Sequence, residues 1–309
     1  MSIGFRIGAA TDVGAQRDIN QDSYAVGSTV AIVADGMGGH RGGEVASSLA
    51  ASEMLAQFDQ PDLSRLVTAV GQANRRILDA AAANPTLHGM GTTVVAMAVI
   101  EDPAASIGDE PSPADTVETE TWLGVINVGD SRAYRLTGNV LEQLTDDHSL
   151  VETLVREGRL TPEQAKEHPQ RNIVTRALGV LEDVDVDDFR FIPKIGDRYL
   201  LCSDGLFNEV EALEIATILA TYADPQETAN ALVVAANAGG GRDNITTVVV
   251  DIVAPDQSAM PAAAQALASG DNIEGADPSV PDPTDDAVAA FDAPESSGAE
   301  SKQRWSWRR

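Results

Sequence analysis

The chain has 309 residues, of which 48 are acidic and 21 are lysine or arginine, so its formal net charge is −27. Such an acidic chain lacks the basic surface that nucleic acids and anionic membranes require. The single cysteine, Cys202, excludes an intramolecular disulfide and a multi-cysteine metal cluster, and we expect a cytoplasmic protein. The sequence predicts no transmembrane segment, because no run of about 18 apolar residues occurs in it.

A sharp change of composition near residue 254 divides the chain. Residues 254–309 are rich in Ala, Pro, Ser and Gly, and they carry ten acidic and four basic side chains. Almost no branched apolar residues occur there, so the segment cannot bury enough surface to offset its chain entropy. We therefore predict one folded domain over residues 1–253 and an acidic, disordered tail over residues 254–309.

Periodic apolar segments predict the elements of the folded part. Runs rich in β-branched residues predict strands over residues 29–34, 92–100, 121–128, 198–202 and 244–253, with another short strand after Asp22. Apolar residues at helical spacing predict helices over residues 43–58, 62–80, 148–157, 161–167, 211–221 and 225–238. The Pro- and acid-rich segment 101–120 lies between two of the strands and is predicted to be a long hairpin loop.

The order of these elements indicates the fold class. Strands come in groups joined by short turns, and the first two long helices follow one another directly. A doubly wound parallel sheet would instead alternate strands with helices. The sequence therefore predicts an α+β protein in which helices cover antiparallel sheets.

Five aspartates at strand ends are the candidate functional residues: Asp22, Asp35, Asp130, Asp204 and Asp243. Most stand beside glycine or a small polar residue, which lets a ligand approach the rim of a rigid sheet closely. Converging carboxylates repel one another, and oxygen ligands favour Mg²⁺ or Mn²⁺ over zinc. Asp-Gly pairs are also common turns and Asp is a common helix cap, so the pattern alone leaves a structural role open for each residue.

The arrangement of these residues in motifs carries a family resemblance. The motifs, in chain order, are Arg17-x-x-Asn20-Gln21-Asp22, Asp35-Gly36-Met37-Gly38-Gly39-His40, Gly89-Met90-Gly91-Thr92-Thr93, Gly129-Asp130-Ser131-Arg132, Ser203-Asp204-Gly205-Leu206 and Asp243-Asn244-Ile245-Thr246. This ordered set resembles the metal-dependent protein phosphatase family, also called protein phosphatase 2C. Segment 168–179 is typical of its bacterial branch, and the actinobacterial type fits best. The resemblance spans residues 5–253 and implies a phosphatase catalytic domain built as a four-layer α-β-β-α sandwich, with two antiparallel sheets flanked by helices.

The resemblance also implies metal-binding roles for individual residues. Asp35 would bridge two Mn²⁺ or Mg²⁺ ions, and the Gly36 carbonyl would contact the second ion. Asp204 and Asp243 would complete the protein ligands of the first ion, while Asp22 would hold metal-bound water.

Two further roles are implied by the same family. Asp130 would join Asp204 at the third metal position of bacterial members, and Arg17 would bind the substrate phosphate with its guanidinium fork. Two metal ions about 3.5–4 Å apart generate hydroxide at neutral pH, and that hydroxide attacks phosphorus in line. Asp35 and Arg17 are thus the expected catalytic residues.

The function implied is a protein serine/threonine phosphatase that reverses the work of Ser/Thr kinases. Its partners would be phosphorylated proteins, including the kinases and their substrates, and we expect a monomer. The main alternative is a phosphoprotein-binding pseudophosphatase, which the loss of a metal aspartate would signal. Two further alternatives are a hydrolase of small phosphate esters and a dedicated phosphatase for one anti-sigma-factor antagonist.

The histidines and the cysteine receive mostly structural interpretations. Eukaryotic members place His directly after Asp-Gly, where this chain has Met37, so a structural role is favoured over a general-acid role for His40. His88, His148 and His168 are expected at the surface. Cys202 is expected in the core, because no phosphate loop of a tyrosine phosphatase accompanies it.

Residues 145–180 would form the flap beside the active site. Asp146, Asp147 and His148 near its start are predicted to be a solvated cluster, with a substrate-contacting edge as the alternative.

Overall fold

The computed structural model describes residues 3–38, 41–103, 119–138 and 140–259. Its strands are β1 (Gly4–Asp12), β2 (Asp22–Val26), β3 (Val30–Met37), β4 (Gly91–Thr92), β5 (Val94–Pro103), β6 (Thr119–Val128), β7 (Arg132–Thr137), β8 (Val140–Gln143), β9 (Asp187–Phe191), β10 (Arg198–Cys202) and β11 (Ile245–Val253). Its helices are α1 (Gly42–Gln57), α2 (Leu63–Ala83), α3 (Leu150–Arg156), α4 (Pro162–Lys166), α5 (Asp204–Phe207), α6 (Ala212–Thr221) and α7 (Pro225–Gly239).

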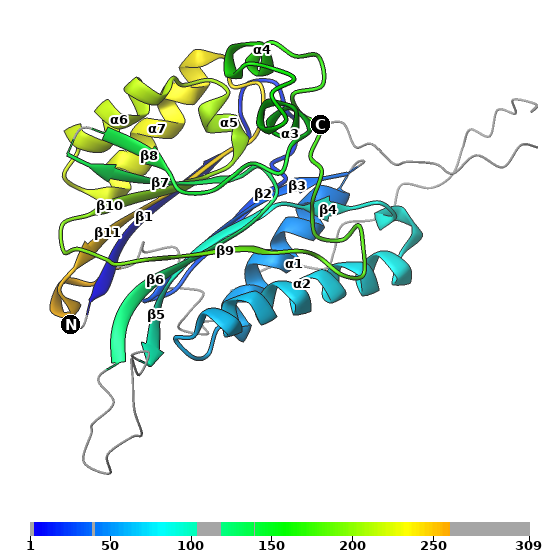
Figure 1. The fold of residues 1–309 in the computed structure, drawn as a ribbon. Coiled ribbons are helices and arrows are strands. Elements are labelled where there is room, and N and C mark those ends of the chain that lie inside the picture. The colour runs from blue at the N-terminus through cyan, green and yellow to red at the C-terminus, as the bar shows by residue number, and fades with distance from the viewer. Residues whose placement is uncertain (1–2, 39–40, 104–118, 139, 260–309) are drawn as a thin grey trace, which may run out of the picture.

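Two antiparallel sheets stack on one another, and helices cover both outer faces (Figure 1). One sheet has the strand order β1-β11-β10-β7-β8, and the other has β2-β3-β5-β6-β9 with β4 paired to β3. Helices α6 and α7 lie on the first sheet, and α1 and α2 lie on the second (Figure 1). The predicted four-layer α-β-β-α sandwich is therefore confirmed.

The predicted helices all form, with ends shifted by a few residues. Thr161 caps α4 in a reciprocal capping box with Gln164. Strands β1, β7, β8 and β9 and the short helix α5 were not predicted. Strand β1 contains glycine and alanine where β-branched residues are usual, so its composition gives only a weak strand signal.

Strands β5 and β6 form the predicted hairpin and extend into the segment that was expected as loop. Their pairing runs from Val94 opposite Val128 to Pro103 opposite Thr119. The remainder of the predicted loop, residues 104–118, lies outside the described residues.

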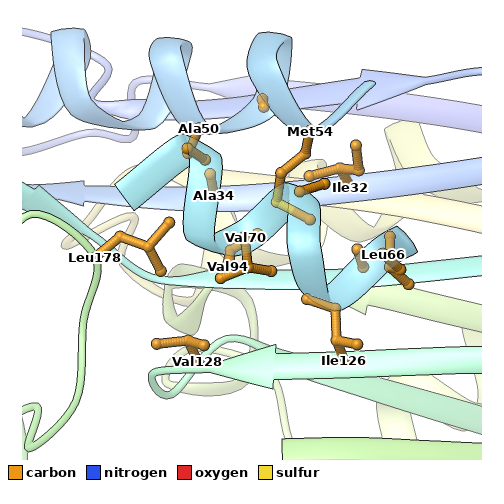
Figure 2. Close-up of a cluster of buried hydrophobic side chains, with 14 of the residues drawn as sticks. Ile32, Ala34, Ala50, Met54, Leu66, Val70, Val94, Ile126, Val128 and Leu178 are labelled. Atoms are coloured by element: carbon orange, nitrogen blue, oxygen red, sulfur yellow. The ribbon is translucent and has the colours of Figure 1, made fainter. Parts of the chain in front are cut away.

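Apolar side chains fill the spaces between the layers. Between α1, α2 and the second sheet, Met54 and Leu66 pack with Ile32 and Ile126, all fully or nearly fully buried (Figure 2). Burying one such side chain contributes about 1.5–3 kcal/mol. A second cluster, to which strands of both sheets contribute, joins the two sheets face to face. The sheets are thus rigid supports for the residues at their ends.

The chain continues past Val253 along the edge of the first sheet. Ala259 accepts a hydrogen bond from the Ile7 amide at 2.9 Å and donates one to the Phe5 carbonyl at 3.0 Å. The rest of the predicted tail, residues 260–309, lies outside the described residues, so the domain division stays a prediction. None of the helices in the described ranges combines the length and hydropathy needed to cross a bilayer.

Candidate active site

Asp22 and Asp35 face each other at one end of the second sheet. Asp22 begins β2, Asp35 lies near the end of β3, and the two are paired residues of the antiparallel ladder. Both side chains are buried. The hydroxyl of Ser203, at the end of β10 in the other sheet, donates a hydrogen bond to Asp22 Oδ2 at 2.7 Å. Asp22 therefore lies at the seam between the two sheets.

Thr93 connects Asp35 to the turn that carries Asp130. The amide of Asp35 donates to Thr93 Oγ1 at 3.1 Å, and the Thr93 amide donates back to the Asp35 carbonyl at 2.9 Å. Thr93 Oγ1 also lies 2.7 Å from the hydroxyl of Ser131, the residue after Asp130. Asp130 is buried, and the hydroxyl of its neighbour Ser131 ties its turn to the hydrogen-bonded network around Asp35.

Gly36 occupies a space that no side chain can share. Its amide donates to the Gln21 carbonyl at 3.1 Å. An added Cβ would lie 2.1 Å from the carbonyl oxygen of Gly43 and 2.4 Å from that of Gln21. Glycine here allows the first turn of α1 and the loop before β2 to pack directly on β3.

Asp204 is the first residue of α5 and is buried where β10 ends. The preceding residue, Ser203, donates its amide to the Thr246 carbonyl at 3.1 Å and accepts the Thr246 amide on its hydroxyl at 3.0 Å. An added Cβ on Gly205 would lie 2.0 Å from the Asn244 carbonyl oxygen. Asp204 is therefore packed against the segment that begins β11.

Asp243 and Arg17 form the more exposed side of the site. Their ion pair has an N–O distance of 2.8 Å, and the two side chains are 23% and 37% exposed. Asn244 holds the Arg17 loop in place, because its Nδ2 donates to the Ile19 carbonyl and its Oδ1 accepts from the Gln21 amide. The loop that carries Arg17 thereby leads directly into Asp22.

The predicted site residues therefore meet at one end of the sandwich. Direct contacts pair Asp22 with Asp35 in the ladder and Arg17 with Asp243 by charge, and Ser203, Thr93 and Ser131 connect the strand ends that carry the others. Helices α3 and α4 lie over this end (Figure 1).

The donor atoms brought together here suit a hard divalent cation. They are carboxylate oxygens and the Gly36 carbonyl, whereas zinc sites are built mainly from nitrogen and sulfur. Within the described residues, no three His, Cys, Asp or Glu side chains are already arranged to hold an ion. Mg²⁺ usually keeps several of its waters and binds through one or two carboxylates, so the residues present fit such an ion.

Comparison with known proteins identifies the family. No protein-family model matches the chain. The serine/threonine phosphatase Stp of Listeria welshimeri is 38% identical over 256 residues, which cover 78% of this chain and 93% of that protein. The chain belongs to the metal-dependent serine/threonine protein phosphatase family.

Solved structures of such phosphatases have the same fold. The crystal structure of the Mycobacterium tuberculosis serine/threonine phosphatase PstP/Ppp matches with a TM-score of 0.71 and 37% identity, over 81% of this chain and 99% of that one. The catalytic domain of a serine/threonine protein phosphatase PstP, in complex with two manganese ions, matches with a TM-score of 0.67 and 36% identity, over 82% and 100%.

The start of the flap in this phosphatase differs from the prediction. Asp146 is exposed, but Asp147 and His148 are buried, so the expected solvated cluster is wrong for two of its three members. Arg132 donates hydrogen bonds from Nε and Nη2 to the carboxylate oxygens of Asp147 at 2.7–3.1 Å. Its guanidinium carbon lies 3.6 Å from the ring centre of Phe207 in α5. The ion pair with Arg132 offsets the cost of burying the charged Asp147 side chain. The order of residues in the chain alone does not reveal this pairing.

The cysteine and the other three histidines differ in their exposure. Cys202 is fully buried, as predicted, and burial raises the pKa of its thiol. His88 is exposed and His168 is half-buried. His40 lies outside the described residues. The role of Ser203 as a bridge to Asp22 was not predicted, although it stands next to Asp204 in a motif of the phosphatase.

Proposed function

We propose that this protein hydrolyses phosphoserine and phosphothreonine in proteins with the help of two Mn²⁺ or Mg²⁺ ions. The observation that carries the proposal is the meeting of Asp22, Asp35 and Ser203 at the seam of the sheets, beside Asp204. The relative whose structure contains two manganese ions supports the choice of metal.

The proposed ligands are oxygen atoms on fixed backbone. Asp35 would bridge the two ions and Gly36 would offer its carbonyl to one of them, with Asp204 and Asp243 as further ligands. Asp22 would orient a water molecule of the ions, since Ser203 already fixes one of its oxygens. When bound, the metal pair lowers the pKa of a water molecule and shields the charge of the phosphate.

Asp130 would contribute to a third ion, as the resemblance implies. Its turn is hydrogen-bonded to Asp35 through Ser131 and Thr93, so it belongs to the same rigid end of the sandwich. This proximity supports a third ion beside the first two.

Arg17 would bind the substrate phosphate. Its side chain is more than a third exposed, and its guanidinium is held at the site by Asp243. A planar fork of N–H donors matches two oxygens of a phosphate dianion. On phosphate binding, Arg17 would exchange part of its contact with Asp243 for the more highly charged ligand.

The partners and the compartment follow as further proposals. A phosphatase of this class would act on phosphorylated Ser/Thr kinases and on their substrates. The strongly acidic chain would favour basic residues around the phosphosite. A monomer in the cytoplasm remains our prediction.

The pseudophosphatase alternative would require a lost ligand, but Asp35, Asp204 and Asp243 are all present. The substrate class is tested by comparing kcat/KM for a phosphothreonine peptide with that for small phosphorylated metabolites. We expect the peptide to be preferred, with Asp204→Asn as the inactive control. A strong preference for a metabolite would instead support the small-ester hydrolase, and phosphopeptide binding without turnover would support the pseudophosphatase.

A further inference from the structure

His148 is buried, with 5% of its surface exposed, and it is hydrogen-bonded to Gly129, the residue before Asp130. Its Nδ1 accepts a hydrogen bond from the Gly129 amide at 3.0 Å, and its own amide donates to the Gly129 carbonyl at 2.9 Å. His148 thus bonds to both backbone groups of Gly129, and Asn127 Nδ2 also donates to the Gly129 carbonyl at 3.1 Å. Gly129 itself has a φ of +114°, a conformation that residues with side chains rarely adopt.

The opposite edge of the imidazole is fixed by a charged pair. Nε2 lies 3.0 Å from Asp187 Oδ2 at the start of β9, and it also lies 3.0 Å from Nη1 of Arg176. The same Arg176 nitrogen donates to Asp187 Oδ1 at 2.6 Å. Because Nδ1 accepts from Gly129, the neutral ring carries its proton on Nε2 and donates to Asp187. Asp187 therefore selects the tautomer that can hold the Gly129 amide.

His148 also lies where the flap leaves and rejoins the sandwich. Its carbonyl accepts the Thr175 amide at 2.7 Å, and Ser149 forms an isolated bridge with Val174. The ring therefore stands between the Asp130 turn on one side and the two ends of the flap on the other.

We propose that His148 is a positioning residue: its Nδ1 accepts the hydrogen bond of the Gly129 amide, and this bond sets the direction of Asp130 toward a third divalent cation. This inference rests on the proposed function of Asp130. Without an acceptor at Nδ1, the Gly129 amide loses its partner in a buried place, and the turn shifts to regain one. Hydrogen-bonding partners behind metal ligands commonly change metal affinity by about 10–100-fold when they are mutated.

Two conservative variants distinguish the roles of the two ring nitrogens of His148. His148→Asn keeps an acceptor close to the place of Nδ1, whereas His148→Gln keeps a donor close to the place of Nε2. His168→Gln is the matched control, because His168 lies on the same flap and its ring, among the described contacts, accepts only from the Gln170 amide. Asp187→Ala is a second route to the same effect, because without the Asp187 carboxylate the imidazole proton is no longer held on Nε2. Asp187 is one-third exposed, so its replacement leaves no buried cavity.

The measurement is Mn²⁺ binding by isothermal titration calorimetry with the full chain, followed by kcat and KM for a phosphothreonine peptide. We expect His148→Gln to weaken the weakest Mn²⁺ binding step by about tenfold or more. His148→Asn and His168→Gln should stay within about threefold of wild type, and Asp187→Ala should fall between. In His148→Gln, the KM for the peptide should change by a smaller factor than the Mn²⁺ concentration at which kcat reaches half of its maximum.

Equal losses in His148→Asn and His148→Gln would overturn the inference, because ring packing rather than the Gly129 bond would then matter. Wild-type binding in His148→Gln would overturn it as well. If His148→Gln does not fold, the test passes to Asp187→Ala, whose wild-type binding would also overturn it. Asp130→Asn tests the proposed third ion separately. If Asp130→Asn leaves Mn²⁺ binding unchanged, the proposed role of Asp130 is wrong, whatever the His148 variants show.

Discussion

Asp22 and Asp35 are paired residues of one antiparallel ladder, yet the hydroxyl that fixes the Asp22 carboxylate comes from Ser203, directly after β10 of the opposite sheet. The site is therefore assembled across the seam of the sandwich rather than within one sheet. The inter-sheet core behind it, with Val33 and Leu201 among its members, sets how far apart the two strand ends lie.

Ser203→Ala tests that bridge. The variant leaves Asp22 Oδ2 without this donor and the Thr246 amide without its acceptor, both in buried surroundings. We expect a loss of about 1–3 kcal/mol in the free energy of unfolding, measured with urea, together with reduced turnover. Ser52→Ala on the exposed side of α1 is the control and should change stability by no more than about 0.5 kcal/mol. Equal stability of the two variants would contradict the bridge.

Gly36→Ala tests the close approach of α1 to β3. The new methyl group would collide with the backbone oxygen of Gly43, so the strand end and the helix would have to separate. We expect a large fall in the melting temperature or no folded protein. Gly71→Ala is the matched change, because nothing lies within 4 Å of its Cβ position in α2, and it should be neutral or stabilising by about 0.5–1 kcal/mol. A Gly36→Ala protein as stable as wild type would show that the packing is looser than described.

Arg17→Ala tests phosphate binding. We expect KM for a phosphothreonine peptide to rise about tenfold or more, while the free energy of unfolding changes by less than about 1 kcal/mol, because an exposed ion pair contributes little. Arg65→Ala removes another exposed, paired arginine, on α2, and serves as the control for charge. An unchanged KM in Arg17→Ala would remove Arg17 from the substrate site.

Much of this architecture was predictable from the sequence, for reasons that are visible in particular elements. In strand β11 every residue except Asp251 is β-branched, and the strand is buried along its whole length, so composition and burial agree. The burial of Asp147 and His148 was not predictable, because their partners Arg132 and Asp187 are 15 and 39 residues away in the chain. A polar residue is buried when a distant partner satisfies it, and local patterns carry no information about that partner.

The buried histidine predicts a pH dependence of stability. Burial lowers the pKa of His148 below its ordinary value of 6.5, and Arg176 acts in the same direction, while the hydrogen bond with Asp187 opposes them. The unfolded chain therefore binds the proton more readily than the folded one, and His148 costs stability as the pH falls below 6.5. Asp187, whose pKa is also lowered, loses its contribution only in more acid solution.

Chemical denaturation at pH 7.5 and at pH 5.5 measures the effect. Between these values we expect the free energy of unfolding to fall further in the wild type than in His148→Asn. His88→Asn, at an exposed position, should keep the wild-type slope. The same slope in all three proteins would mean that His148 is solvated and titrates normally.

The most direct measurement is phosphate release from a phosphothreonine peptide by the purified full chain with EDTA, Mg²⁺ or Mn²⁺. We predict activity only with added metal, and its loss in Asp35→Asn and Asp243→Asn proteins that remain folded by circular dichroism. Activity that persists in EDTA, or that both variants retain in full, would contradict a phosphatase site built on these aspartates.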